Sequence, residues 1–324
     1  FWGRIYMGEY ANTLGKSLMK IGFLCPGQAS QKVGMGLDLY EKTELGKKYF
    51  DIANEIMDID IKKIIFDGPD EKLKETQFTQ PAIYIVSVII GELLIEKGIN
   101  PTYAAGHSLG EYSALTLAES FNFKEGLELV KIRALEMQKA CENNSGSMAA
   151  ILGLEDNIVE EICESYKNGI VVAANFNAKG QVVISGEKDA VKNIMVEMLD
   201  AGAMKAIELN VSGAFHSPLM SSAKKILAEK LLSAKINNSK FPVYANVSSK
   251  PISKDSEIRK SLIDQLESPV QWHQIISNMI YDGVKLAIEV GPGRVLKGLS
   301  KRIDRSLNMT SIESHEEIIN YQYV

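Results

Sequence analysis

The sequence predicts an α/β fold with a parallel sheet and a smaller inserted subdomain. Short apolar runs at residues 21–25, 102–106, 242–246 and 285–290 are typical of buried strands. Longer runs with helical periodicity separate these strands, which predicts parallel pairing with helices covering the faces of the sheet. A compact group of further strand patterns follows Gly146 and is too short to continue the large sheet, which predicts a separate subdomain.

Helical patterns connect the strands of the large sheet. One of them carries Pro81 in its expected first turn and stops at Gly98. Its apolar stretch, 82–95, is interrupted by polar residues and is too short to span a bilayer, so we expect a buried helix. The helical patterns of this part of the chain cover residues 45–57, 79–97, 109–118, 124–140, 218–234, 271–281 and 293–303.

The inserted segment has the order strand, helix, strand, strand, helix, strand, which is the split βαβ, ferredoxin-like arrangement. Its strands are expected at residues 147–152, 170–174, 181–185 and 203–209, with helices at 155–166 and 187–201. We therefore expect a core of residues 19–144 and 212–308, with 145–211 inserted as the subdomain. Residues 1–18 are expected to be a leader, because Met19-Lys20 and the strand after it are typical of a natural start, and 309–324 a C-terminal tail.

Composition narrows the class of protein. The 324 residues carry a net charge of −5 and no Lys/Arg block, which argues against a nucleic-acid partner. The three scattered cysteines indicate reduced thiols rather than a zinc site or disulfides, so we expect a cytoplasmic protein with no metal. We also expect no membrane association, no bound cofactor and a monomer.

The stretch Gly106-His107-Ser108-Leu109-Gly110 has the pattern Gly-x-Ser-x-Gly between a strand and a helix. In this setting the serine lies on a sharp turn that exposes its hydroxyl as a nucleophile. Glycines on both sides remove the Cβ atoms that would clash in the turn, and the helix N-terminus directs N–H groups towards developing negative charge. A plain glycine-serine loop is the alternative that this pattern leaves open.

A serine nucleophile needs a base, and the chain has four histidines. His107 is adjacent to Ser108 and is expected to point elsewhere, His273 lies in a helical stretch, and His315 lies in the polar tail. His216 lies in a turn-rich segment where the chain returns from the inserted subdomain, and clefts form at such junctions. We therefore predict His216 as the base.

Two further positions are candidates, and one expected partner is missing. No acidic residue between Ser108 and His216 has a motif that would make it the third member of a triad, so backbone carbonyls could orient the imidazole instead. Arg133 lies at the edge of an apolar helix face, where it could line a cleft or be an ordinary surface arginine. A backbone N–H in Pro26-Gly27-Gln28 could complete an oxyanion hole, or the segment could be a simple turn.

Taken together, these motifs resemble the malonyl-CoA:acyl carrier protein transacylases of bacterial type II fatty-acid synthesis. The resemblance runs from Met19 to Ile303. Besides the motifs already named, it depends on Ala174-Asn175-Phe176-Asn177, Gln181 to Gly186, Gly213-Ala214-Phe215-His216-Ser217, Pro269-Val270-Gln271-Trp272 and Glu289 to Gly293. It implies an α/β-hydrolase-like core with a ferredoxin-like insertion. Ala29 departs from the glycine that the family usually has at this position.

The resemblance implies a role for each residue. Ser108 would carry the acyl group and His216 would be its base, while Arg133 would bind the free carboxylate of the malonyl group. The backbone N–H groups of Gln28 and Leu109 would form the oxyanion hole. The Gln271 carbonyl would orient the histidine, and His107 and Phe215 would line the substrate pocket.

The resemblance also implies the substrates, malonyl-CoA and the phosphopantetheine thiol of acyl carrier protein. Three alternatives stay open: an acyltransferase that serves a polyketide synthase, a serine thioesterase or hydrolase of the same fold, and a non-catalytic module on a decayed enzyme fold. The missing third acid and the cation at position 133 argue against the hydrolase.

Overall fold

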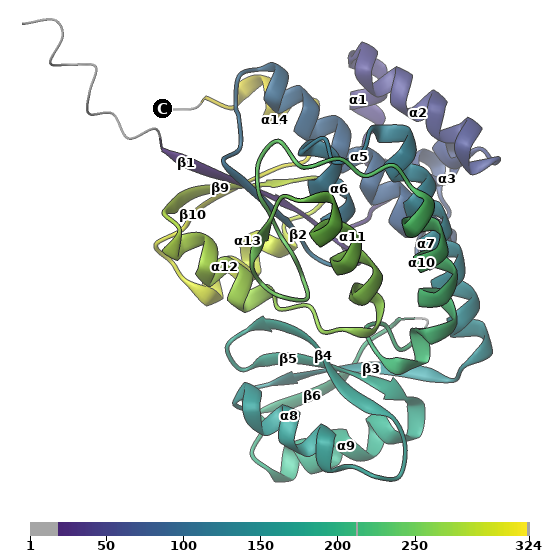
Figure 1. The fold of residues 1–324 in the computed structure, drawn as a ribbon, viewed down its shortest axis with the longest axis vertical. Coiled ribbons are helices and arrows are strands. Elements are labelled where there is room, and N and C mark those ends of the chain that lie inside the picture. The colour runs from purple at the N-terminus through teal and green to yellow at the C-terminus, as the bar shows by residue number, and fades with distance from the viewer. Residues whose placement is uncertain (1–18, 212, 323–324) are drawn as a thin grey trace, which may run out of the picture.

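The computed structural model describes residues 19–211 and 213–322, and the leader predicted at 1–18 lies outside the described residues. Its larger sheet has the strand order β10-β9-β1-β2-β7-β8 (Figure 1). All neighbouring pairs are parallel except β7 and β8, which confirms the parallel pairing predicted for the four core strands. The strands are β1 (Lys20–Cys25), β2 (Tyr103–Gly106), β7 (Val243–Tyr244), β8 (Pro251–Ile252), β9 (Val284–Val290) and β10 (Asn308–Ile312).

Helices cover both faces of this sheet (Figure 1). Side-chain caps fix several helix starts: Thr43 accepts from the Gly46 N–H, and Asn122 forms a capping box with Glu125. The elements before the inserted segment are α1 (Leu37–Lys42), α2 (Glu44–Met57), α3 (Ile61–Asp67), α4 (Asp70–Leu73), α5 (Thr76–Glu96), α6 (Gly110–Leu117) and α7 (Phe123–Asn143). Those after it are η1 (Pro218–Met220), α10 (Ser221–Ser233), α11 (Asp255–Asp264), η2 (Gln265–Glu267), α12 (Trp272–Tyr281), α13 (Val295–Ile303) and α14 (His315–Asn320).

Helix α5 is the central buried helix of the core. It spans 21 residues, so it is longer than the apolar run predicted, and by length and composition it could cross a membrane. Its most apolar window, however, is 78% buried inside the protein, which fits the core helix that the sequence predicted. Pro81 lies inside this helix rather than in its first turn, because the helix begins five residues earlier, at Thr76.

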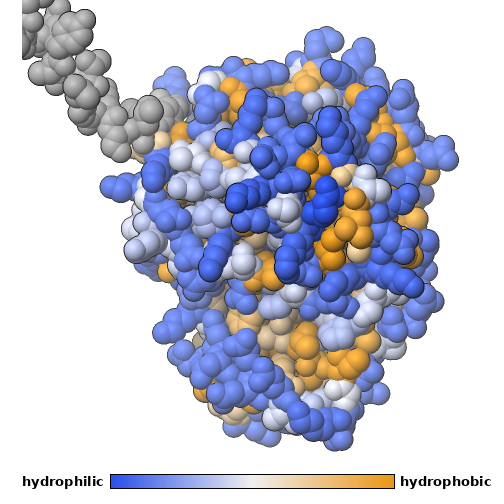
Figure 2. All heavy atoms as spheres, viewed as in Figure 1, coloured by the Kyte–Doolittle hydropathy of each residue, from blue (hydrophilic) through white to orange (hydrophobic). Residues whose placement is uncertain are grey.

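The inserted segment forms a second, antiparallel sheet with the order β4-β5-β3-β6. Its two helices pack on one face of this sheet (Figure 1), and Figure 2 shows an apolar patch over the same body on an otherwise mostly hydrophilic face. The predicted order of elements in this segment is confirmed: β3 (Gly146–Leu152), α8 (Asp156–Ser165), β4 (Val171–Ala178), β5 (Gln181–Glu187), α9 (Lys188–Asp200) and β6 (Lys205–Glu208).

The two bodies share a short backbone joint. Val270, in the segment before α12, donates its N–H to the carbonyl of Ala174, and Phe176 donates back to the Val270 carbonyl, both at 2.9 Å. These bonds form an isolated parallel bridge between β4 and the segment that carries Ser268. The smaller sheet is thus bonded directly to the larger body.

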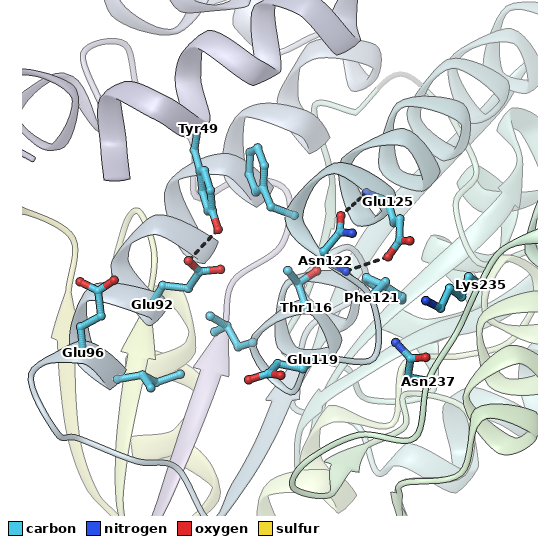
Figure 3. Close-up of a pocket in the computed structure, with 13 residues that line it drawn as sticks. Tyr49, Glu92, Glu96, Thr116, Glu119, Phe121, Asn122, Glu125, Lys235 and Asn237 are labelled. Atoms are coloured by element: carbon cyan, nitrogen blue, oxygen red, sulfur yellow. Dashed lines mark hydrogen bonds between the residues drawn. The ribbon is translucent and has the colours of Figure 1, made fainter. Parts of the chain in front are cut away.

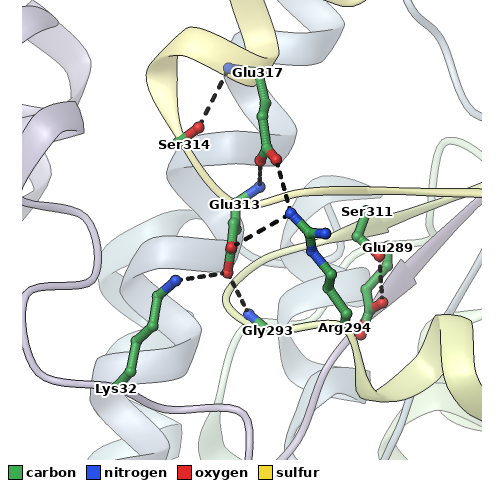
Figure 4. Close-up of polar contacts among 8 residues, drawn as sticks. All are labelled: Lys32, Glu289, Gly293, Arg294, Ser311, Glu313, Ser314 and Glu317. Carbon is green, nitrogen blue, oxygen red and sulfur yellow. Dashed lines mark hydrogen bonds and ion pairs between the residues drawn. The ribbon is translucent and has the colours of Figure 1, made fainter.

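Residues 309–324 are not a detached tail, so this prediction is wrong for the part that the structure describes. Strand β10 pairs with β9 and forms an edge of the large sheet, because its apolar side chains complete the core. The Glu313 carboxylate accepts from the Gly293 N–H at 2.9 Å and from Lys32 at 3.0 Å (Figure 4). Lys97 donates to the last carbonyls of α14, which holds this helix against the core.

Candidate active site

The turn between β2 and α6 has the geometry that the Gly-x-Ser-x-Gly pattern predicted. Ser108 has a φ of 51°, in the left-handed region that side chains rarely adopt. A Cβ on Gly106 would lie 1.8 Å from the backbone carbon of Gly110, and one on Gly110 would lie 2.1 Å from the Cys25 carbonyl oxygen. Only glycine fits at these two positions, which explains the motif.

The side chain of Asn246, just after β7, holds this turn. Its Nδ2 donates to the Gly106 carbonyl at 2.6 Å, and its Oδ1 accepts the Ser108 backbone N–H at 2.7 Å. Asn246 is fully buried. Because it bonds on both sides of residue 107, the turn keeps its strained backbone by tertiary contact as well as by sequence.

Ser108 and His216 meet as predicted. The Ser108 Oγ lies 2.8 Å from His216 Nε2. His216 Nδ1 lies 3.0 Å from the carbonyl oxygen of Gln265 and 3.2 Å from that of Ser268. A carbonyl only accepts, so Nδ1 carries the proton and Nε2 is left as the acceptor for the serine hydroxyl. Within the part of the chain that the structure describes, two carbonyls and no carboxylate contact Nδ1, and they hold the imidazole in the tautomer of a general base.

The prediction that Gln271 orients the histidine is wrong. The carbonyls at His216 Nδ1 belong to Gln265 and Ser268, whereas the Gln271 carbonyl accepts the Ile275 N–H. Gln271 is the N-cap of α12, so its carbonyl is committed to the first hydrogen bond of that helix.

Burial keeps His216 neutral. The side chain is almost completely buried, and this desolvation, together with the nearby Arg133 guanidinium, lowers the pKa of His216 to about 3. The two carbonyls oppose this shift only in part. The imidazole is thus ready to accept a proton at neutral pH.

Arg133 lies beside the same hydroxyl. It is 0% exposed, which excludes the surface-arginine alternative, and its Nη2 lies 3.0 Å from Ser108 Oγ. Nη1 donates to the Gln80 side-chain oxygen at 2.6 Å, and Nη2 also donates to that of Gln265 at 2.9 Å. These partners are all neutral, and burial lowers the pKa of the guanidinium. Among the described residues, Arg133 has no carboxylate in ion-pair contact, and its Nε meets no acceptor.

The Pro26-Gly27-Gln28 loop packs directly against the serine turn. A Cβ on Gly27 would lie 2.5 Å from the His107 carbonyl oxygen, so only glycine permits this approach. Within residues 19–211 and 213–322, the backbone N–H groups of Gln28 and Leu109 donate to no protein acceptor. Ala29 has a φ of 76°, a conformation that favours glycine, which is the residue that the resembled family usually has there.

The two residues assigned to the substrate pocket have clear structural contacts. His107 Nε2 lies 2.8 Å from Asn177 Oδ1 on β4, and its ring packs against Trp272. Phe215 is buried in the main hydrophobic core next to His216. His107 therefore points away from Ser108 Oγ and links the core to the inserted sheet.

The sequence did not indicate three side-chain amides of this site, which belong to Gln80, Asn246 and Gln265. All three are buried and bond to Ser108, Arg133 or the turn around them. Gln80 precedes the helix proline, and Gln265 lies in a short 3-10 turn, where no local pattern indicates a site. Only their tertiary contacts show what they do.

A separate surface pocket of about 490 Å³ lies between α2, α5 and the loop that leads to α7 (Figure 3). Its lining includes the carboxylates of Glu92, Glu96, Glu119 and Glu125 and a single cation, Lys235. This excess of negative charge disfavours an anionic substrate there. None of the predicted site residues lines it.

The chain belongs to a known class of transferase. The chain matches the acyl transferase domain family over residues 22–316 and is a member of that family. It is an acyltransferase.

More particularly, its relatives are malonyl transferases. The malonyl CoA-acyl carrier protein transacylase of Bacillus subtilis is 40% identical over 303 residues, which cover 93% of this chain and 96% of the relative. The crystal structure of an acyl carrier protein S-malonyltransferase from Vibrio cholerae has a TM-score of 0.89 at 40% identity and covers 93% of this chain and 99% of its own. A malonyl-transacylase in complex with a type II PKS acyl-carrier protein has a TM-score of 0.89 at 38% identity, covering 93% and 98%.

Proposed function

We propose that this enzyme transfers the malonyl group of malonyl-CoA to the phosphopantetheine thiol of acyl carrier protein, through a malonyl ester of Ser108, for fatty-acid synthesis. The names of its relatives support this substrate and acceptor. The observation that carries the proposal is a buried guanidinium that forms no ion pair with any described residue, 3.0 Å from a hydroxyl that also contacts a neutral histidine. That arrangement suits a substrate with a reactive carbonyl and a carboxylate close to it.

His216 starts the reaction. Its Nε2 takes the proton of the Ser108 hydroxyl as Oγ attacks the thioester carbonyl, which becomes a tetrahedral oxyanion. The free N–H groups of Gln28 and Leu109 are the donors for this oxyanion. The carbon–sulfur bond then breaks, and the protonated histidine returns its proton to the coenzyme A sulfur. The carrier thiol attacks the resulting ester by the same steps in reverse, which frees Ser108.

Arg133 selects the acyl group in this proposal. A guanidinium and a carboxylate form a directional, charge-assisted pair, and the low-dielectric surroundings of Arg133 strengthen it. An acetyl group would leave the buried cation without an anion. The position of Arg133 beside Ser108 Oγ fits a carboxylate only a few bonds away from the carbonyl under attack.

Several broader assignments belong to the same proposal. We assign the large sheet and its helices, with β10 and α14 included, to an α/β-hydrolase-like core, residues 19–144 and 213–322, and residues 145–211 to a ferredoxin-like insertion; the strand order β4-β5-β3-β6 supports the second assignment. The enzyme would act as a cytoplasmic monomer without a resident cofactor. His107 and Phe215 would shape the acyl pocket by supporting Ser108 and His216, their neighbours in the chain, rather than by touching the reacting atoms.

Intact-mass measurement tests the function. Incubation with malonyl-CoA should add one malonyl group to the wild-type protein, and subsequent holo-acyl carrier protein should remove it and appear malonylated. Ser108→Ala should show no adduct, whereas Ser113→Ala, at a serine of α6 whose hydroxyl has no hydrogen-bond partner among the described residues, should be labelled like the wild type. An adduct on Ser108→Ala would contradict the assignment. Loss of the adduct to water without carrier protein would indicate a hydrolase.

A further inference from the structure

Glu111 is a buried carboxyl group beneath the serine turn that the reaction steps above do not use. It lies in the first turn of α6, three residues after Ser108, and is 0% exposed. Its Oε2 accepts from the Gln265 side-chain nitrogen at 2.7 Å and from the Asn246 backbone N–H at 3.1 Å. Its Oε1 accepts from the Ser261 hydroxyl at 3.2 Å. Two segments far from Glu111 in the sequence, the one around Asn246 and the one from Ser261 to Gln265, therefore converge on one side chain.

Gln265 is the residue through which Glu111 reaches the site. The Gln265 side-chain nitrogen donates to Glu111 and also to the Ser108 carbonyl, at 3.1 Å. Both protons of the amide are thereby used on one side. The amide oxygen is consequently turned towards Arg133, from which it accepts a hydrogen bond at 2.9 Å. The main-chain carbonyl of the same residue accepts from His216 Nδ1.

A flipped Gln265 amide would damage the site. Its NH₂ group would then face the Arg133 guanidinium, donor against donor, while its oxygen would face the Glu111 carboxyl group. Arg133 would lose one of the two amide oxygens that accept its hydrogen bonds. The turn whose main-chain carbonyl orients His216 would lose the hydrogen bonds of the Gln265 amide nitrogen that hold it in place. Glu111 Oε2, which is the nearer of the two acceptors at the amide nitrogen, opposes this flip together with the Ser108 carbonyl oxygen.

We propose that Glu111 is a positioning residue that fixes the orientation of Gln265 and, through it, the placement of both His216 and Arg133. The proposal rests on the proposed function only for the role of Arg133. What matters is the reach of an acceptor to Gln265 rather than negative charge. Burial raises the pKa of Glu111 to about 7, and a neutral acid with its proton on Oε1, facing Ser261, presents the same acceptor at Oε2.

Two substitutions separate reach from charge. Glu111→Asp keeps the charge but withdraws the acceptor by one methylene, so we expect kcat for malonyl transfer to fall about 100-fold, the scale of a misplacement near 1 Å. Glu111→Gln keeps the reach, with its oxygen at Oε2 and its nitrogen facing the Ser261 hydroxyl, and should recover most of that loss. Ser261→Ala is the matched control, because it removes the third contact of Glu111 without touching Gln265.

Two readouts distinguish positioning from general destabilisation. The ratio of malonyl to acetyl transfer should fall in Glu111→Asp, because Arg133 is held less firmly, and the unfolding midpoint reports whether each variant is folded. Reaction of Ser108 with a sulfonyl fluoride needs only the serine and histidine, so it should also slow in Glu111→Asp even if malonyl-CoA proves not to be the substrate. A wild-type enzyme that reacts with the sulfonyl fluoride but not with malonyl-CoA would overturn the proposed function alone.

The opposite pattern overturns the positioning role. Wild-type rates and selectivity in folded Glu111→Asp would do so, as would a 100-fold loss in Glu111→Gln together with full activity in Glu111→Asp. If Glu111→Asp does not fold, Gln265→Met tests the same link, because it keeps the main-chain carbonyl and removes the amide. An unchanged malonyl-to-acetyl ratio in folded Gln265→Met would then refute the proposal.

Discussion

Replacing Arg133 should reduce malonyl transfer far more than acetyl transfer. The guanidinium is completely buried and its hydrogen-bond partners among the residues described are all neutral, so the substrate carboxylate would supply its ion-pair partner. Removing one member of such a buried, hydrogen-bonded charge pair costs about 2–5 kcal/mol. This energy corresponds to a loss of roughly 30- to 5,000-fold in kcat/KM for malonyl-CoA.

Arg133→Met is the informative variant, because methionine keeps the unbranched apolar stem of arginine and removes the guanidinium. The substitution leaves the buried side-chain oxygens of Gln80 and Gln265 without their donor, so we expect a folded protein with a lower unfolding midpoint. Acetyl transfer should stay within about threefold of the wild-type rate or increase, since an acetyl group gains nothing from the cation. Arg294→Met, on the exposed side chain that pairs with Glu317, is the control for loss of an arginine as such.

The assay follows coenzyme A release from malonyl-CoA and from acetyl-CoA, with holo-acyl carrier protein as acceptor, for all three proteins. Selectivity is the ratio of the two kcat/KM values. Equal losses for the two acyl groups in a folded Arg133→Met protein would refute the carboxylate-binding role. In that case Arg133 would act on Ser108 itself, which its 3.0 Å contact with Oγ also permits.

Three more predictions concern the base and the oxyanion loop. Because the pKa of His216 is lowered to about 3, the rate at which a sulfonyl fluoride labels Ser108 should stay constant between pH 8 and pH 5, and a fall centred near pH 6.5 would contradict the burial argument. Between about pH 6.5 and pH 3 the unfolded protein binds a proton at His216 that the folded protein does not, so the unfolding midpoint should decrease as the pH falls through this window, and it should decrease less in His216→Gln. Gly27→Ala should slow acylation about 10²- to 10³-fold, the effect of losing one oxyanion donor, because its Cβ would press on the His107 carbonyl. Gly298 has open space around it, so Gly298→Ala is the control and should leave acylation unchanged. Equal acylation rates in Gly27→Ala and the wild type, measured by single-turnover mass spectrometry, would refute this prediction.

The parts of the site that could be predicted are those encoded locally. The turn around Ser108 needs glycines where a Cβ would strike backbone, so the requirement is visible in five consecutive residues. The strands of the large sheet are short apolar runs that lie between helices, which leaves little choice of pairing. His216 could be predicted by elimination among four histidines and by its place at a junction.

The remaining contacts depend on tertiary structure. The carbonyl that orients His216 comes from Gln265 in a short turn, and nothing in the residues around it distinguishes it from Gln271 six positions later. Arg133 looked like a helix-edge residue because periodicity does not show that α5 and η2 close over it. Residues 308–312 were not predicted as a strand because only two of the five, Met309 and Ile312, are apolar, so no clear apolar run marks them.

The bridge between β4 and Val270 has a mechanical consequence. Two residues before that bridge, the Ser268 carbonyl contacts the imidazole of His216. The smaller body therefore cannot swing as an independent lobe: a tilt must either break two backbone hydrogen bonds or pull on the peptide that steadies the catalytic ring. A macromolecule that binds the insert and displaces it would therefore shift the Ser268 carbonyl as well, because that carbonyl lies only two residues before the bridge.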